Sequence, residues 1–136
     1  MIRFKNEITI RRPAEEVFGF LANFENIPKW NYYVRSVRKV SDGEIGPHSV
    51  FHQIREDDEQ TYEIIDYRPH ESLIVKTRPG SKLQFERAFT LRSVNGATEV
   101  VDDWELDTGR SGLLEKLAAS TVKKLSSNSL WTHSRY

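Results

Sequence analysis

Apolar and polar side chains alternate along residues 83–91 and again along residues 98–106, and Asn95-Gly96 lies between the two stretches. A period of two is typical of a β-strand with one buried and one solvated face. Asn-Gly favours a two-residue type I′ turn, because both residues tolerate a positive φ. We therefore predict a β-hairpin here. Its register pairs Val94 with Ala97, Phe89 with Asp102, and Arg87 with Trp104.

Five further strands are predicted before this hairpin. The first lies around residues 8–10 and stops at Pro13, and the other four occupy residues 34–40, 49–55, 61–67 and 72–77. The breaks between strands carry turn signals, chiefly Gly, Asn and Pro, where the chain can reverse or the hydrogen-bond ladder cannot continue.

Helical signals occur near both ends of the chain. Residues 14–21 follow Pro13 as a short helix, and residues 24–31 form a short aromatic helical turn. After residue 110 the apolar spacing becomes that of a long helix, with Ser111 as its N-cap. Its apolar stripe comprises Leu114, Leu117, Ala118, Thr121, Val122 and Leu125.

This order of elements predicts an α+β fold. A curved antiparallel sheet of about seven strands would wrap around the long C-terminal helix, with the two short helices closing one end. The 136 residues form one domain by size. Such an arrangement is a container, so the functional question is what it holds.

The amino-acid composition argues against several classes of function. Twenty basic residues balance twenty acidic ones, which argues against a nucleic-acid partner. No cysteine is present, which excludes disulfides and thiolate sites, and no two histidines have metal-ligand spacing. No apolar run reaches the ~20 residues of a membrane span, and the first residues lack a signal-peptide core. We expect a cytoplasmic monomer or homodimer with no metal, no cofactor and no stable membrane insertion.

Several motifs match a known family in their order and spacing. They are residues 10–18, residues 26–30, Gly43 and Gly46, residues 66–69, residues 96–100, and Asn128 with Leu130. Over essentially the whole chain the sequence resembles the START-like helix-grip superfamily, which includes the plant pollen-allergen fold. More narrowly, it resembles the bacterial polyketide cyclase/dehydrase and lipid-transport (SRPBCC) family.

The resemblance implies a cavity under the long helix, where family members bind sterols, lipids, polyketides, quinones or hormones. Some members are cyclases or dehydratases, and the fold does not fix the activity. We expect this protein to bind a small hydrophobic or amphipathic molecule. The alternatives are a cyclase/dehydratase-like enzyme that uses the same cavity, and a lipid or quinone chaperone.

Arg87 and Asp102 are diagonal neighbours on the predicted inner face of the hairpin. Burying a lone charge is costly, so this pair should satisfy itself or meet a ligand. In the first interpretation Arg87 binds a carboxylate, phosphate or enolate oxygen and is oriented by Asp102, with Trp104 stacked on its guanidinium. In the second, the two form a structural ion pair at the wet mouth of the barrel.

Aromatic residues recur on the same predicted face. They would line an apolar cavity or simply fill a core, and the family resemblance favours the cavity. The predicted ligand-binding residues are Trp30, Phe51, Tyr62, Phe85, Arg87, Phe89, Asp102, Trp104, Leu117 and Thr121. No catalytic residue is assigned.

The inward face of residues 50–54 is left open by the pattern. His52 alternates with Val50 and Ile54, so it points either inward or outward beside Glu63. Facing Glu63, His52 would be a candidate general base. The other interpretation is a solvated cross-strand pair.

Overall fold

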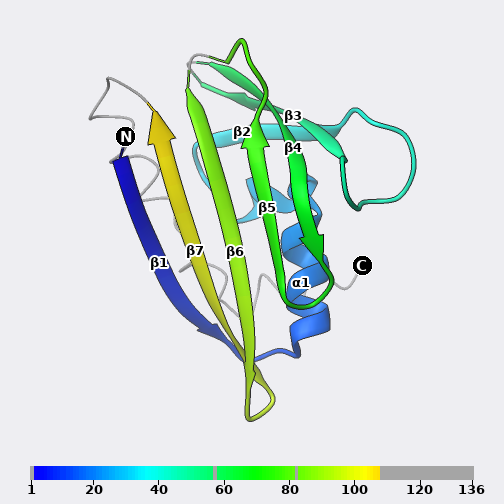
Figure 1. The fold of residues 1–136 in the computed structure, drawn as a ribbon, viewed down its shortest axis with the longest axis vertical. Helices are drawn as coiled ribbons and strands as arrows, with labels where there is room; N and C mark the ends of the chain where they lie inside the picture. The colour runs from blue at the N-terminus through cyan, green and yellow to red at the C-terminus, as the bar shows by residue number, and fades with distance from the viewer. Residues whose placement is uncertain (1, 57, 82, 108–136) are drawn as a thin grey trace.

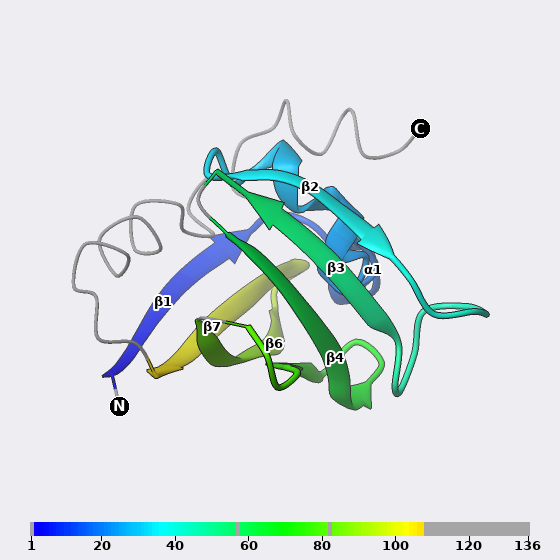
Figure 2. The same cartoon turned by 90° about the horizontal axis from the view of Figure 1, so that it is seen from above.

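The computed structural model describes residues 2–56, 58–81 and 83–107. Seven antiparallel strands form one sheet in the order β1-β7-β6-β5-β4-β3-β2. The sheet curves strongly, and the helical segments lie on its concave side (Figures 1 and 2). The strands are β1 (Ile2–Ile10), β2 (Val34–Lys39), β3 (Val50–Arg55), β4 (Glu59–Arg68), β5 (Ser72–Thr77), β6 (Gln84–Val94) and β7 (Ala97–Asp107).

Two short helical elements follow β1, as predicted. The helix α1 (Ala14–Ala22) begins after Pro13, whose carbonyl accepts the first helical hydrogen bonds, and its early Glu15 and Glu16 suit the positive end of the helix dipole. The side chain of Asn23 then accepts the backbone N–H of Glu25 and starts the 3₁₀ segment η1 (Phe24–Lys29). The predicted C-terminal helix, with Leu117 and Thr121, lies outside the described residues.

The hairpin of β6 and β7 has the predicted register. Asn95 and Gly96 have φ angles of 50° and 82°, as a type I′ turn requires. Val94 pairs with Ala97, Phe89 with Asp102, and Arg87 with Trp104. The side chains of one face are buried against the concave interior: Phe85, Arg87, Phe89 and Leu91 on β6, and Thr98, Val100, Asp102, Trp104 and Leu106 on β7.

The first strand is longer than the sequence pattern indicated. β1 starts at Ile2 and pairs with β7 along its whole length, from Ile2 opposite Leu106 to Ile10 opposite Thr98. The prediction recognised only the end of this strand, because polar residues dominate its first half. Its alternation is nevertheless regular, since Phe4, Asn6 and Ile8 are half-buried while Lys5 and Glu7 are exposed.

The structure shows which face of β3 points inward, a question that the sequence pattern left open. Phe51, Gln53 and Arg55 point inward and are buried, whereas His52 and Ile54 lie on the outer face. The predicted pairing of His52 with Glu63 is wrong. The turn between β3 and β4 is shorter than expected, because β4 already begins at Glu59, and this places His52 opposite Thr61.

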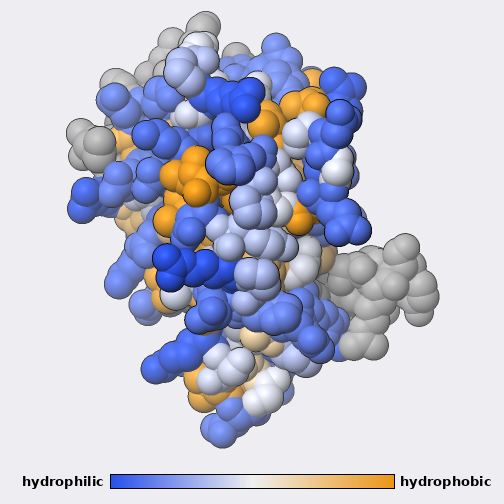
Figure 3. Space-filling model, turned by 45° about the vertical axis from the view of Figure 1, so that its right-hand side comes forward, coloured by the Kyte–Doolittle hydropathy of each residue, from blue (hydrophilic) through white to orange (hydrophobic). Residues whose placement is uncertain are grey.

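On the outer face His52 contacts neighbours other than Glu63. Its ring nitrogens lie 2.9 Å from Thr61 Oγ1 and 3.0 Å from Glu59 Oε1. Glu63 instead contacts His48 and Arg78, and these two partners hold the pKa of its carboxyl below the usual value. Figure 3 shows a mainly hydrophilic face with small, separate hydrophobic spots, the usual surface of a globular domain.

Replacing Gly96 by alanine is expected to destabilise the protein by about 1 kcal/mol, because an L-residue is strained at this positive φ. Gly46→Ala is the control, since its added Cβ meets no atom within 4 Å and its φ is not left-handed. Urea unfolding of both variants measures the difference. Equal stabilities would contradict the type I′ assignment.

Candidate functional site

A continuous band of aromatic rings covers the concave side of the sheet. It runs from β3 across β4 and β6 to β7 and β1, and Phe24 of η1 packs against it. Neighbouring rings have centroids 5.2–6.5 Å apart, within the range of favourable aromatic packing. The band comprises Phe51, Tyr62, Phe85, Phe89, Trp104 and Phe4, together with Phe24.

A bidentate ion pair is buried within this band. Arg87 Nε lies 2.7 Å from Asp102 Oδ1, and Arg87 Nη2 lies 2.8 Å from Asp102 Oδ2. The Trp104 indole N–H donates to Asp102 Oδ2 at 3.1 Å. The side chains of Arg87 and Asp102 are 4% and 0% exposed. The pair is therefore mutually satisfied and does not lie at a wet mouth.

The Arg87 guanidinium is also surrounded by aromatic faces. Its central carbon lies 4.2 Å from the ring centroid of Trp104, 4.5 Å from that of Phe89 and 5.2 Å from that of Trp30. Each ring offers a cation–π contact, which gains strength when water is excluded. The predicted stacking of Trp104 on Arg87 is thus present, and Trp30 of the segment after η1 joins it.

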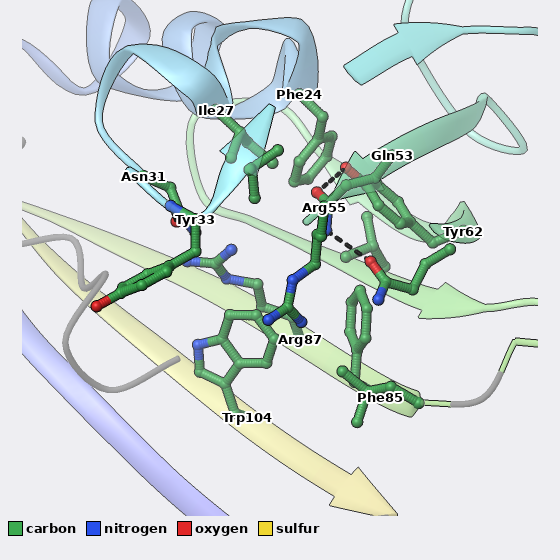
Figure 4. Close-up of a pocket in the computed structure, with 14 residues that line it drawn as sticks. Phe24, Ile27, Asn31, Tyr33, Gln53, Arg55, Tyr62, Phe85, Arg87 and Trp104 are labelled. Atoms are coloured by element: carbon green, nitrogen blue, oxygen red, sulfur yellow. Dashed lines mark hydrogen bonds between the residues drawn. The ribbon is translucent and has the colours of Figure 1, made fainter. Parts of the chain in front are cut away.

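A chain of hydrogen bonds joins β3 to β4 beside the aromatic band (Figure 4). The Tyr62 hydroxyl donates to Gln53 Oε1 at 3.1 Å, and Gln53 Nε2 donates to Gln60 Oε1 at 2.8 Å. Gln60 Nε2 in turn donates to Asp58 Oδ2. Burial raises the pKa of Tyr62 far above its ordinary value, against the smaller opposing effect of the Arg87 charge. Tyr62 is therefore a neutral hydrogen-bond donor.

A second arginine enters the same region from β3. Figure 4 shows the side chains of Arg55 and Arg87 both projecting into the space beneath η1. Arg55 is buried, with a side chain that is 6% exposed, and its Nε lies 3.8 Å from Asp58 Oδ1. That distance allows electrostatic attraction but exceeds a hydrogen bond.

These groups surround one small pocket. Its volume is about 20 Å³, which is room for one or two water molecules. η1 and the residues after it form one wall, and the sheet forms the other. The lining comprises Phe24, Ile27, Asn31, Tyr33, Val34, Gln53, Arg55, Gln60, Tyr62, Val75, Leu83, Phe85, Arg87 and Trp104.

Four of the predicted ligand-binding residues line this pocket, namely Tyr62, Phe85, Arg87 and Trp104. Four more are buried around it without lining it: Trp30, Phe51, Phe89 and Asp102. The remaining two, Leu117 and Thr121, lie outside the described residues.

Sequence reasoning missed the polar side of the pocket. Gln53 and Arg55 were overlooked because the inward face of β3 was left open, and Gln60 because the predicted strand began at residue 61, two residues after the start of β4. A signal was present, since Phe51 alternates with Gln53 and Arg55. The opposite set, His52 with Ile54, looked equally suited to burial.

Two classes of site are not found in the part of the chain that the structure describes. No cluster of three or more His, Asp or Glu side chains is arranged to hold a metal ion there. No helix among those residues is long and apolar enough to cross a membrane.

Breaking the buried ion pair from one side should be costly. Arg87→Met or Asp102→Leu alone is expected to lower the free energy of unfolding by about 3–5 kcal/mol, because each leaves an uncompensated buried charge. The double variant should lose much less than the sum of the two. Urea unfolding of all four proteins measures the coupling, and strictly additive losses would contradict it.

The ionisation of Tyr62 should affect stability only at high pH. Its pKa is raised in the folded protein, so the unfolded state alone ionises above about pH 10, and stability falls as the pH rises. Between about pH 9 and about pH 11, Tyr62→Phe should lose roughly 1 kcal/mol less stability than the wild type. Tyr32→Phe is the control, since Tyr32 is 88% exposed. An unchanged pH profile in Tyr62→Phe would contradict the burial of an un-ionised hydroxyl.

Solved structures share this fold at low sequence identity. A START superfamily protein from Mycobacterium smegmatis is 15% identical, with a TM-score of 0.72 over 98% of this chain and 95% of that one. An aromatase/cyclase from a Streptomyces species is 13% identical, with a TM-score of 0.72 over 98% and 93%. A protein from Deinococcus radiodurans is 18% identical, with a TM-score of 0.66 over 88% and 91%. At these identities the likeness concerns the fold alone.

Sequence comparison addresses family membership, which the shared fold does not establish. Among curated proteins, none matches this chain. The sequence profile of the family described as polyketide cyclase / dehydrase and lipid transport, however, matches residues 1–130, which is almost the entire chain. The resemblance to this family predicted from the motifs is confirmed: the chain, whose fold is shared with the solved START superfamily protein, belongs to the polyketide cyclase/dehydrase and lipid transport family.

Proposed function

We propose that this protein binds a small amphipathic molecule on the concave side of its sheet. One observation carries the proposal: four rings of the aromatic band (Phe24, Tyr62, Phe85 and Trp104) and a set of buried polar side chains line the same pocket. Ligand sites typically combine a predominantly apolar wall with a few fixed polar groups. Here the wall would hold the ligand body, and Gln53, Arg55 and Gln60 would meet its polar end.

The aromatic band supplies most of the affinity in this proposal. Removing apolar surface from water contributes about 25 cal/mol per Å², so covering roughly 200 Å² of ligand carbon provides on the order of 5 kcal/mol. Rings on both walls, such as Phe24 and Phe85, suit a flat or aliphatic body. The polar groups would add orientation more than affinity.

Binding requires the pocket to open, because about 20 Å³ holds only water. The wall that moves in this proposal is the segment from η1 to β2, which contributes Ile27, Asn31 and Tyr33 to the lining. The turn at Arg78-Pro79-Gly80 follows β5, which contributes Val75 to the lining, and is the alternative hinge. Either movement would separate Phe24 from the sheet and expose the aromatic band.

The cyclase/dehydratase alternative needs a group that moves protons. The part of the lining that the structure describes contains no histidine and no carboxylate. Asp102, just behind it, is held by Arg87 and Trp104. Binding is therefore proposed first. Turnover of a polyketide-like substrate would establish the enzyme, and transfer of bound ligand to vesicles would establish the lipid or quinone chaperone.

A neutral aromatic probe tests the pocket directly. Phenylnaphthylamine should bind stoichiometrically with enhanced fluorescence, and Val75→Phe should weaken this binding at least about tenfold by filling the pocket. Ile74→Phe is the matched control, because Ile74 lies next in the strand and faces the other side of the sheet. Thermal unfolding of both variants checks that they fold.

Native mass spectrometry of the gently purified protein supplies the second readout. A small molecule present in the native complex and lost on denaturation would identify the ligand class. Absence of such a molecule, together with no binding of phenylnaphthylamine, would contradict the proposal and leave the aromatic band as a filled core.

A further inference from the structure

The pocket contains two buried arginines in different electrostatic states. Arg87 is fully matched by Asp102, with two hydrogen bonds of 2.7 Å and 2.8 Å. Arg55 is nearly as buried, yet among the described residues its carboxylate partner is Asp58, whose Oδ1 lies 3.8 Å from Arg55 Nε. Within the described residues its guanidinium donates no hydrogen bond. The two side chains therefore differ in what they can offer a ligand.

Asp58 is an incomplete partner for Arg55. One of its carboxylate oxygens, Oδ2, accepts the side-chain N–H of Gln60. The other, Oδ1, faces Arg55 Nε beyond hydrogen-bonding distance. A guanidinium has five N–H donors, and burying them without acceptors is costly. Among the described residues, no side chain accepts a hydrogen bond from the guanidinium of Arg55, which lines the pocket.

The other polar groups of the lining are largely occupied with one another. Tyr62 donates to Gln53, and Gln53 donates to Gln60. Asn31 Oδ1 accepts the backbone N–H of Tyr33, so its side-chain NH₂ group is the part left to serve as a donor. The charged group that the described lining leaves to a ligand is thus the guanidinium of Arg55, which can only donate and calls for an acceptor on the ligand.

We infer that Arg55 makes this pocket selective for anionic amphiphiles, that is, molecules with an apolar body and a terminal oxyanion such as a carboxylate. The inference rests on the ligand-binding function proposed above and names the ligand class. The planar guanidinium matches a carboxylate with two parallel hydrogen bonds, which are stronger than those between neutral groups. The oxyanion would replace Asp58 as the principal partner of Arg55.

Arg87 serves a separate purpose in this scheme. Its charge is neutralised by Asp102 and covered by three aromatic rings, so it stiffens the floor of the pocket without competing for the anion. In this scheme Arg87 holds the structure of the pocket in place, and Arg55 binds the anionic group of the ligand. Substituting Arg55 should alter ligand selectivity, whereas substituting Arg87 should alter stability.

A pair of probes with one skeleton separates charge recognition from apolar binding. Anilinonaphthalene sulfonate carries an oxyanion, and phenylnaphthylamine is its neutral counterpart. Arg55→Met keeps an unbranched apolar stem and removes the guanidinium with its charge. We expect this variant to bind the sulfonate probe about 10- to 100-fold more weakly, as loss of a charge-assisted hydrogen bond implies, and to bind the neutral probe unchanged.

Asp58→Asn provides the opposing variant. It removes the negative charge that competes for Arg55, so affinity for the sulfonate probe should stay the same or rise. If Arg55 only stabilises the β3–β4 turn through Asp58, the two variants should affect both probes in the same way. That result, with folding verified by circular dichroism, would overturn the inference while leaving the proposed function intact.

Displacement by unlabelled ligands then identifies the class. Decanoate should displace phenylnaphthylamine from the wild-type protein at least about tenfold more effectively than decanol does, and this preference should vanish in Arg55→Met. Equal displacement by the acid and the alcohol would overturn the inference alone. Failure of both naphthyl probes to bind the wild-type protein would overturn the proposed function, and the inference with it.

Discussion

The ion pair between Arg87 and Asp102 determines how the concave side of this protein is organised. It joins adjacent positions of β6 and β7 at a depth where neither charge is stable alone. Trp104 donates to the carboxylate, and the rings of Trp104, Phe89 and Trp30 cover the guanidinium. The aromatic band is therefore arranged around a fixed charge. A core of aliphatic residues alone would lack such an orienting centre.

This constraint separates two functions of polar residues inside the sheet. On the side of β6 and β7, Arg87 and Asp102 neutralise each other, and their ion pair makes this part of the pocket rigid. On the side of β3 and β4, the chain from Tyr62 through Gln53 and Gln60 ends at a carboxylate that only partly matches Arg55. The unequal matching of the two arginines distinguishes the supporting part of the pocket from the part that we propose to be receptive.

The sequence predicted most of the fold because its strongest signals are local. Asn95-Gly96 determined one turn, and that turn set the register that placed Arg87 beside Asp102 and opposite Trp104. β3 lacked such a signal. Phe51 and Ile54 lie on opposite faces of it, so hydrophobicity alone did not show that Gln53 and Arg55 point inward. The register between β3 and β4 depends on the length of the turn that joins them. The acidic residues of that turn are compatible with several lengths, so the sequence did not fix the register.

The lining of the pocket by η1 was harder still to predict. Its members Phe24, Ile27, Asn31 and Tyr33 come from a short 3₁₀ segment and the residues after it, where no regular period relates sequence to direction. Their positions follow from packing against the sheet. The motifs around Trp30 nevertheless indicated the family, which the match over residues 1–130 established.

The small volume of the pocket has a kinetic consequence. If the protein binds a ligand as proposed, opening of the wall at η1 would limit both capture and release, because the resting space admits only water, and diffusion of the ligand would not be limiting. Association rates would then level off at high ligand concentration, and different ligands would leave at similar rates. The residence time of a bound ligand would then be set by the opening rate of the protein and not by the chemistry of the ligand.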